Sequence, residues 1–400
     1  MSGPRFWGRA FEVAALTRLL REGAHVSLTA PRRIGKTSLM REVGERLRDE
    51  FTVLHVDLQR ARSAADLIAD LGIESRSHRN LWSRTRDVFR NVLGSVEELE
   101  VDALSLRLRS GLVGDWQHKG ERLLAEFAQA SPDTIIFIDE LPILVNHLLV
   151  GADHRMTGEG RQQAEDLLSW LRAASIRFKG KLRFVIAGSI GLAPILRKAK
   201  LSAALNTFTP FVLEPWDHAT ARGALYALAA NYGVRWGEGA IEHTVTKLGC
   251  CVPHHVQLFW SLLHFDAQRR GVFHLQIADV DRVFSQRLLG SRGQAELSHF
   301  EERLRWVLGP ALEPLCFDLL SEAAIVGRLQ PIGARTLLAE HQPPRGLDDL
   351  REILDVLEHD GYLAQEHDGS YVFVSALVRE WWRLRFSLSY TPLGQRGDTP

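Results

Sequence analysis

The sequence predicts an α/β protein with a parallel sheet in its first half, followed by two smaller regions. Up to about residue 215, short apolar runs alternate with helical stretches. This alternation is typical of a parallel sheet covered by helices on both faces. The expected strands are residues 25–29, 53–58, 134–138 and 182–187. Ligands of such sheets usually bind at the carboxyl ends of the strands.

The composition bounds the class of protein. A chain of 400 residues exceeds what one hydrophobic core usually holds, so we expect two or three domains. The 49 Lys and Arg balance the 49 Asp and Glu, which gives no overall electrostatic reason to expect a nucleic-acid coat protein or a polybasic membrane binder. The three cysteines are expected to be reduced thiols, and no segment has the pattern of a signal peptide or a membrane span. We therefore expect a cytoplasmic protein.

Changes of pattern divide the chain into regions. Residues 1–215 are the predicted αβ core, and an insertion at 61–119 contains VEELEVDALSLRLR, whose alternation of apolar and polar residues suggests a β-hairpin. Residues 216–300 form helical stretches that end at glycines, which indicates a small helical lid. In residues 301–390, three helical stretches precede two short strands around an Asp-Gly turn, which is the order of a winged helix. Residues 391–400 are expected to be a flexible tail.

The stretch TAPRRIGKTSLM lies between a predicted strand and a predicted helix, as a phosphate-binding loop (P-loop) does. Gly35 lets the backbone approach phosphates, Lys36 can reach the β- and γ-phosphates, and the Thr37 hydroxyl can bind magnesium. Ala30 stands where the usual pattern has its first glycine, but Pro31 favours an extended backbone there, so the alanine is compatible with a nucleotide site. The expected contacts are Pro31, Arg32, Arg33, Ile34, Gly35, Lys36, Thr37 and Ser38, and either arginine is a candidate to reach the γ-phosphate or a carboxylate of the C-terminal region.

The stretch TIIFIDELP, about a hundred residues later, is a buried strand that ends in two carboxylates. We expect Asp139 to hold Mg²⁺ through its water shell and Glu140 to polarise the attacking water. Ser189 ends the strand LRFVIAGS and is a candidate sensor of the γ-phosphate. The simpler alternative in each case is a strand that merely ends in polar residues. Glu140, Lys36 and Ser189 are the expected catalytic residues, with ATP or ADP and Mg²⁺ as cofactors.

These motifs, together with FWGRAFEVAALTRLL, GCCVPHHVQLFW and DGYLAQEHDGSYVFVSALVREWWRLRF, resemble the prokaryotic STAND-type ATPases of the archaeal-ATPase branch of the AAA+ superfamily. The resemblance implies a P-loop ASCE (AAA+-like) core with the carboxylate strand beside the P-loop strand, a helical lid, and a C-terminal winged-helix domain that folds back over the nucleotide. It places Phe6, Gly8 and Arg9 near the adenine and matches Pro253 to the lid element that closes on the base. The arginine that the wider group often carries after the sensor strand is missing, and Arg197 is a candidate substitute. Slow, switch-like turnover is therefore expected.

Three other clusters have alternative interpretations. CCVPHH invites a zinc site, but structural zinc needs a second ligand pair at a distance, so a helix started by proline is favoured. Trp381 and Trp382 lie among arginines, either as a surface for nucleic acid or a partner or, more simply, as the packing face of the last helix. The candidate recognition helix, PRGLDDLREILDVLEHDG, carries six acidic residues against two arginines and would repel DNA phosphates, although Arg328 and Arg335 nearby leave DNA possible.

The sequence therefore predicts a slowly hydrolysing ATP switch in which the nucleotide controls the winged helix and the engagement of a protein partner through the winged helix or the lid. One alternative is a DNA-acting AAA+ ATPase of the origin-binding or transposition-helper type. Another is a nucleotide-bound scaffold that does not hydrolyse ATP, in which Lys36 matters and Glu140 does not. No membrane partner is expected.

Overall fold

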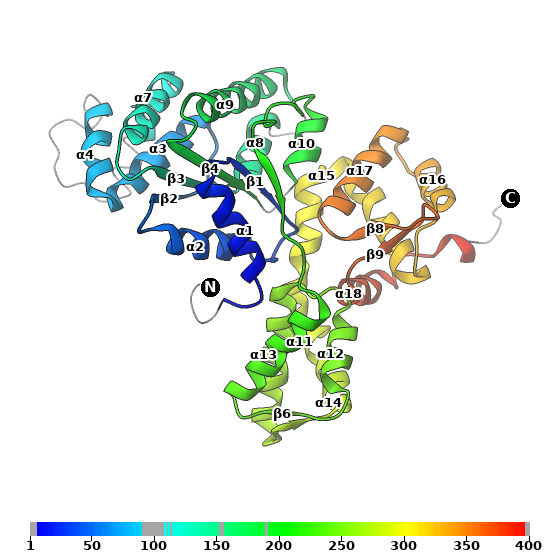
Figure 1. Ribbon diagram of the computed structural model, residues 1–400. Helices are drawn as coiled ribbons and strands as arrows, with labels where there is room; N and C mark the ends of the chain where they lie inside the picture. The colour runs from blue at the N-terminus through cyan, green and yellow to red at the C-terminus, as the bar shows by residue number, and fades with distance from the viewer. Residues whose placement is uncertain are drawn as a thin grey trace. The chain divides into compact units, whose positions relative to one another are not determined.

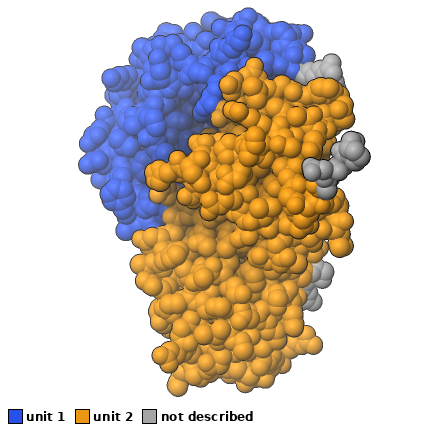
Figure 2. Space-filling view, turned by 90° about the vertical axis from the view of Figure 1, so that its right-hand side faces the viewer, with its two compact units in different colours: residues 1–213 blue, residues 214–400 orange. Residues whose placement is uncertain are grey.

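The computed structural model describes residues 6–89, 108–109, 111–112, 114–151, 156–188 and 191–396, without the side chains of Ser291 and Arg292. The chain divides into two compact units, Met1–Leu213 and Glu214–Pro400 (Figure 2). The β-hairpin expected in VEELEVDALSLRLR lies outside the described residues, except for the last two, Leu108 and Arg109, which are helical. No helix among the described residues combines the length and apolar character that a membrane crossing requires.

Unit 1 is built on a five-stranded parallel sheet in the order β2-β3-β4-β1-β5. Its strands are β1 (Val26–Thr29), β2 (Thr52–Asp57), β3 (Thr134–Asp139), β4 (Leu182–Ala187) and β5 (Thr209–Val212). The four strands expected from the sequence are confirmed. The expectation that the carboxylate strand β3 lies directly beside the P-loop strand β1 is wrong, because β4 pairs with both and lies between them. The edge strand β5 was not predicted, since three of its four residues are exposed and one of them is a proline, Pro210.

Helices cover both faces of this sheet, with α1 and α2 on one side and α7 and α9 on the other (Figure 1). The helices of unit 1 are α1 (Ala10–Arg21), α2 (Lys36–Leu47), α3 (Ala64–Glu74), α4 (Arg79–Val88), α7 (Trp116–Ala128), α8 (Leu141–Leu149), α9 (Gly158–Arg177) and α10 (Leu192–Lys198), with the short 3₁₀ helix η2 (Ser75–Ser77) between α3 and α4. A core of buried aliphatic and aromatic residues lies between β2–β4 and the helices α3 and α7 to α9. The described part of the insertion is therefore helical and contributes to the core.

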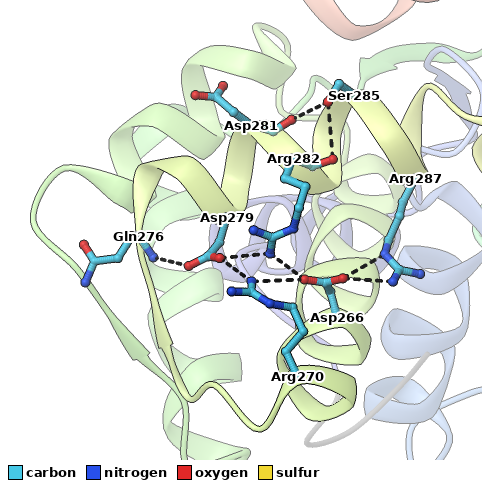
Figure 3. A network of polar contacts seen from close by, with 8 residues as sticks. All are labelled: Asp266, Arg270, Gln276, Asp279, Asp281, Arg282, Ser285 and Arg287. Atoms are coloured by element: carbon cyan, nitrogen blue, oxygen red, sulfur yellow. Dashed lines mark hydrogen bonds and ion pairs between the residues drawn. The ribbon is translucent and has the colours of Figure 1, made fainter.

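The first part of unit 2 is helical, as predicted, with two very short strands. Its elements are α11 (His218–Asn231), β6 (Arg235–Trp236), α12 (Ala240–Leu248), α13 (Pro253–Arg270), β7 (His274–Leu275), α14 (Ile277–Val283) and the π-helical turn η3 (Phe284–Leu288). Two buried carboxylates, Asp266 and Asp279, bind three arginines where α13, α14 and η3 meet (Figure 3). Arg282 donates to both carboxylates, at 2.6 and 2.9 Å, and so joins α14 to α13.

The second part of unit 2 begins within a long helix. Gly309 interrupts α15 (Ser291–Val326) with φ 69° just before Pro310. The elements that follow are α16 (Pro331–Glu340), α17 (Leu347–His359), β8 (Leu363–Gln365), β9 (Tyr371–Phe373), α18 (Ala376–Phe386) and η4 (Leu393–Gln395). β8 and β9 are antiparallel, and Leu329, which lies between α15 and α16, exchanges two backbone hydrogen bonds with Tyr371. The short ribbon thereby acquires a third, single-residue strand.

One hydrophobic core extends through unit 2, from α11 to α18. Trp381 and Trp382 belong to it and are 2% and 0% exposed, which confirms the packing interpretation of this pair. Helix α18 also contacts the helical part directly, because the buried Ser375 hydroxyl donates to the Leu248 carbonyl at 3.2 Å. The cysteines are free thiols, and the described residues contain no group of three or more His, Cys, Asp or Glu side chains placed to hold a metal.

Candidate nucleotide-binding site

The loop between β1 and α2 contains two residues in the left-handed backbone region. Gly35, immediately before α2, has φ 105°, and Arg33 has φ 67°. A Cβ atom on Gly35 would meet no atom within 4 Å, so glycine is needed there for its backbone conformation and not for space. The left-handed conformation costs Arg33 about 1–2 kcal/mol. Such strain is typical of functional sites, where the surrounding structure imposes it.

Lys36 is the first residue of α2, and its side chain turns back onto the loop. The Lys36 ammonium donates to the carbonyl oxygens of Ala30 at 2.8 Å and Pro31 at 3.0 Å, and the residue is 6% exposed. The ammonium is therefore held inside the turn of the loop, beside the amino end of a helix. A cation and a helix amino end together form a site for a phosphate group.

A hydrogen bond joins the loop to the strand that carries the carboxylates. Thr37 Oγ1 donates to Asp139 Oδ2 at 2.6 Å, and the backbone N–H of Glu140 donates to Asp139 Oδ1 at 3.0 Å. Burial raises the pKa of Asp139, although the Thr37 hydrogen bond and the Lys36 charge oppose the rise. A hydroxyl and a carboxylate are hard oxygen ligands, so this pair fits the chemistry of Mg²⁺.

Glu140 and Asp57 bring two more carboxylates to the same edge of the sheet. Glu140 precedes α8 with φ 61°, a left-handed conformation that is rare outside glycine. Asp57 ends β2 and is the register partner of Asp139 in the neighbouring strand. Its negative charge contributes to the raised pKa of Asp139. Asp57 was not among the site residues expected from the sequence, although it lies near the end of the predicted strand 53–58.

Arg9 contacts the loop from the start of α1. It is 6% exposed, and its guanidinium donates to the Ile34 carbonyl at 3.3 Å and to Glu12 Oε1 at 2.6 Å. The Ile34 carbonyl and the Gly35 N–H belong to one planar trans peptide, so they point in opposite directions. Arg9 on the carbonyl side therefore turns the Gly35 N–H away from α1. The observed contact of Arg9 is with the loop, and the contact with adenine expected from the sequence stays a prediction.

Comparison with known proteins addresses the fold. No protein-family model matches the chain, and no curated protein matches its sequence. A Walker-type ATPase of Pyrococcus abyssi matches it with TM-score 0.61 over 94% of this chain and 96% of its own, at 17% identity. The ORC2 protein of Aeropyrum pernix, solved as ADPNP-ADP complexes, matches with TM-score 0.55 over 97% of each chain, at 14% identity. This chain has the fold of an AAA+ P-loop ATPase. At these identities the likeness concerns the fold alone.

In this AAA+ P-loop fold, most of the expected site residues lie in unit 1. The loop residues from Pro31 to Ser38 adjoin Asp139 and Glu140 through the Thr37 hydrogen bond. Phe6 and Gly8 lie just before α1, and Gly8 has φ 67°. Pro253 belongs to unit 2, where it is buried at the start of α13, and its contact with the base stays a prediction.

Two further expectations concern the end of β4 and the helix after it. Ser189, the candidate sensor, lies outside the described residues. Gly188 is described, and a Cβ atom there would lie 2.4 Å from Pro142 Cδ, so only glycine allows this close approach to α8. Arg197 is exposed near the end of α10, and its role as a substitute arginine finger stays a prediction.

Proposed function

We propose that this protein is a STAND-type switch of the AAA+ superfamily that binds ATP with Mg²⁺ and hydrolyses it slowly in the cytoplasm. The observation that carries the proposal is the 2.6 Å hydrogen bond between Thr37 and Asp139. It joins the two groups that would hold the ion although they are far apart in sequence. The simpler alternative, a strand that merely ends in polar residues, does not account for a carboxylate that accepts a hydrogen bond from the P-loop hydroxyl.

The proposed roles follow from the chemistry of each group. Lys36 and the backbone amides of the loop bind the phosphates. Thr37, and Asp139 through the water shell of the ion, would hold Mg²⁺, and the bound ion would withdraw negative charge from the γ-phosphate. Glu140 orients and polarises the attacking water, and Ser189 senses the γ-phosphate. We expect slow turnover because the sequence lacks the arginine that the wider group often carries after the sensor strand, with Arg197 as the candidate substitute.

Production of ADP from ATP tests this function. The parent protein should release ADP only with Mg²⁺, while Glu140→Gln should retain ATP binding and lose turnover, and Lys36→Ala should lose binding. Glu45→Gln, on the exposed side of α2, is the matched control for loss of a carboxylate and should behave as the parent. Turnover of the parent no higher than that of Glu140→Gln would remove hydrolysis from the proposal and leave a nucleotide-bound scaffold.

The switching part of the proposal concerns unit 2 as a whole. We assign its C-terminal half to a winged helix on the order α15, Leu329, α16, α17, β8 and β9, with Leu329 and β9 hydrogen bonded. The helical lid and the winged helix share one core and the hydrogen bond between Ser375 and Leu248. The start of unit 2 is joined to the lid as well, since the backbone N–H of Trp216 donates to the Cys251 carbonyl at 3.1 Å. A nucleotide that bound Pro253 would therefore move lid and winged helix together.

Distance measurements between spin labels test this motion. Labels on cysteines that replace the exposed residues Phe11, Tyr226 and Ile332 report on the core, the lid and the winged helix, respectively. On addition of ATP, the distance between positions 11 and 332 should change, and the distance between 226 and 332 should stay constant. A change between 226 and 332 would show that the winged helix moves independently of the lid.

We propose a protein partner for the winged helix, because of the charge of α17. Its first turn carries Asp348 and Asp349, and the side chain of Asp348 is 96% exposed. Acidic side chains at the start of this helix would repel DNA phosphates. The alternative of a DNA-acting ATPase predicts a gain of duplex affinity with ATP that weakens with salt. Absence of duplex binding at low salt would exclude it.

A further inference from the structure

A second groove in unit 1 lies at the opposite edge of the sheet from the nucleotide site. It has a volume of about 640 Å³ and is lined by α2, the start of β2, the segment from η2 into α4, and residues 130–132 before β3. The P-loop and Asp139 follow the carboxyl ends of their strands, whereas this groove adjoins the amino ends of β2 and β3. Grooves of this volume commonly hold small molecules.

The floor of the groove owes its shape to a glycine. Gly44 of α2 faces β2, and a Cβ atom at this position would lie 2.9 Å from His55 Nε2. The His55 ring stacks on Phe137 of β3, with ring centres 4.7 Å apart, and forms a flat surface. Burial, and next the positive charge of Arg41, lower the pKa of His55 to about 4. His55 is therefore neutral at physiological pH and adds no charge to the groove.

The charge of the groove comes from its arginines. Arg48 is paired with Glu45, the acidic residue of the lining, so these two charges largely cancel. Arg41 of α2 and Arg79 of α4 both line the groove, and neither forms a hydrogen bond or ion pair with any residue in the described part of the chain. Two guanidinium groups without counter-ions thus face one concave site.

Neutral donors complete the lining. Ser131 and Asn80 can donate hydrogen bonds, and the first turn of the ten-residue helix α4 begins at Arg79 with no acidic residue and no side-chain cap. Guanidinium groups prefer phosphate, to which they bind through two parallel hydrogen bonds. Two arginines without counter-ions can pair with two phosphate groups of a small ligand. A nucleic-acid strand is a poorer match, because it needs a longer row of cations along its phosphates.

We propose that this groove binds a small molecule with at least two phosphate groups, held between Arg41 of α2 and Arg79 of α4. The site is separate from the proposed ATP site, and it does not depend on hydrolysis. Its ligand would join α2, which begins at the P-loop, to the helical segment after β2.

Calorimetry with inorganic pyrophosphate tests the site in a Lys36→Ala background, which disables the P-loop. This protein should bind one pyrophosphate per chain, and the further change of Arg41 and Arg79 to alanine should weaken binding at least tenfold. Arg18→Ala in the same background is the control, because Arg18 is an exposed arginine of α1 with one distant ion pair, and it should leave affinity unchanged. Equal affinity of the variants with and without the two arginines, or no binding at all, would overturn the proposal.

Two further readouts locate the ligand and identify its class. Pyrophosphate should slow amide hydrogen exchange in residues 77–81, and protection elsewhere alone would place the ligand outside the groove. A single-stranded oligonucleotide of about 12 nucleotides should bind more weakly than pyrophosphate. If the oligonucleotide bound more tightly than pyrophosphate and its binding depended on the same two arginines, the ligand of the groove would be nucleic acid and the proposal of a small molecule would be wrong. Melting curves of all variants should coincide with that of the background protein, since both arginines are exposed.

Discussion

Arg9 offers a sharp test of how the P-loop is held in shape. Replacing it by methionine keeps much of the apolar stem and removes the donors to the Ile34 carbonyl and to Glu12. A hydrogen bond from a charged group contributes about 1.5–3 kcal/mol. The bond to Ile34 is long, at 3.3 Å, so we take the lower figure, which corresponds to about tenfold in affinity. We therefore expect Arg9→Met to weaken binding of ATP about tenfold.

The choice of ligand distinguishes this role from a contact with adenine. If Arg9 acts on the Ile34–Gly35 peptide, the variant should lose the same factor for ATP and for inorganic tripolyphosphate, which has no base. If Arg9 binds the adenine, only ATP should be affected. Titration calorimetry of both ligands measures the two factors. Arg18→Met, at an exposed position of the same helix, controls for the loss of a positive charge.

The reasoning would be refuted by unchanged tripolyphosphate affinity in the Arg9→Met protein. It would also fail if affinity fell only in proportion to a loss of folded protein, which a thermal melt of the same samples detects. Partial rescue by Arg9→Lys is expected, because a lysine retains one donor and its charge but cannot bond Glu12 and Ile34 in the same fork.

Three other substitutions test separate parts of the structure. Asp57→Asn should raise the Mg²⁺ concentration needed for half-maximal ATP binding by about tenfold, because it removes a carboxylate beside Asp139, and Mg²⁺ titrations measure it. Asp266→Asn should lower the stability of unit 2 by about 2 kcal/mol in calorimetry, because the buried carboxylate loses the charge that strengthens its hydrogen bonds from Arg282 and Arg287. Gly249→Ala should destabilise by about 1–3 kcal/mol, because its φ is 68° and a Cβ would lie 2.7 Å from the Ala376 nitrogen.

Two of these have a matched control. Asp49→Asn removes an exposed carboxylate after α2 and should leave the Mg²⁺ requirement unchanged. If it raised the requirement as much as Asp57→Asn does, the effect would come from the net charge of the protein and not from the position of Asp57. Gly271→Ala has a similar φ of 65° with no atom within 4 Å of the new Cβ, so its smaller cost isolates backbone strain from the clash at Gly249. Equal costs for the two glycines would contradict the close approach of Ala376.

The Asp266 prediction includes a dependence on pH. Burial alone would raise the pKa of Asp266, but hydrogen bonds from Arg282 and Arg287 outweigh it, and the net direction is down. A carboxyl group with a lowered pKa in the folded state stabilises the protein above the ordinary pKa of about 3.9 and loses this contribution as the pH falls below it. The melting temperatures of parent and Asp266→Asn should therefore converge as the pH falls below about 4. A constant difference down to pH 3 would contradict the ion pairs.

Much of unit 1 could be predicted because its signals are local. The apolar runs of β1 to β4 are strands of the sheet, and GKT stands at the start of a helix, so periodicity and motif spacing were sufficient. β5 escaped prediction because it has four residues, three of them exposed, and contains Pro210. Asp57 escaped for a different reason, since an aspartate at the end of a strand acquires meaning only when the neighbouring strand is known.

The sequence by itself determined the P-loop, the carboxylates after β3 and the α/β class, because each follows from residues adjacent in the chain. Only the tertiary structure decided that β4 separates β3 from β1, that Asp57 is in register with Asp139, and that Arg9 holds a carbonyl of the loop. It also decided that α11 to α18 share one core. These contacts join segments far apart in sequence, and such pairings depend on how buried surfaces fit together, which no local pattern records.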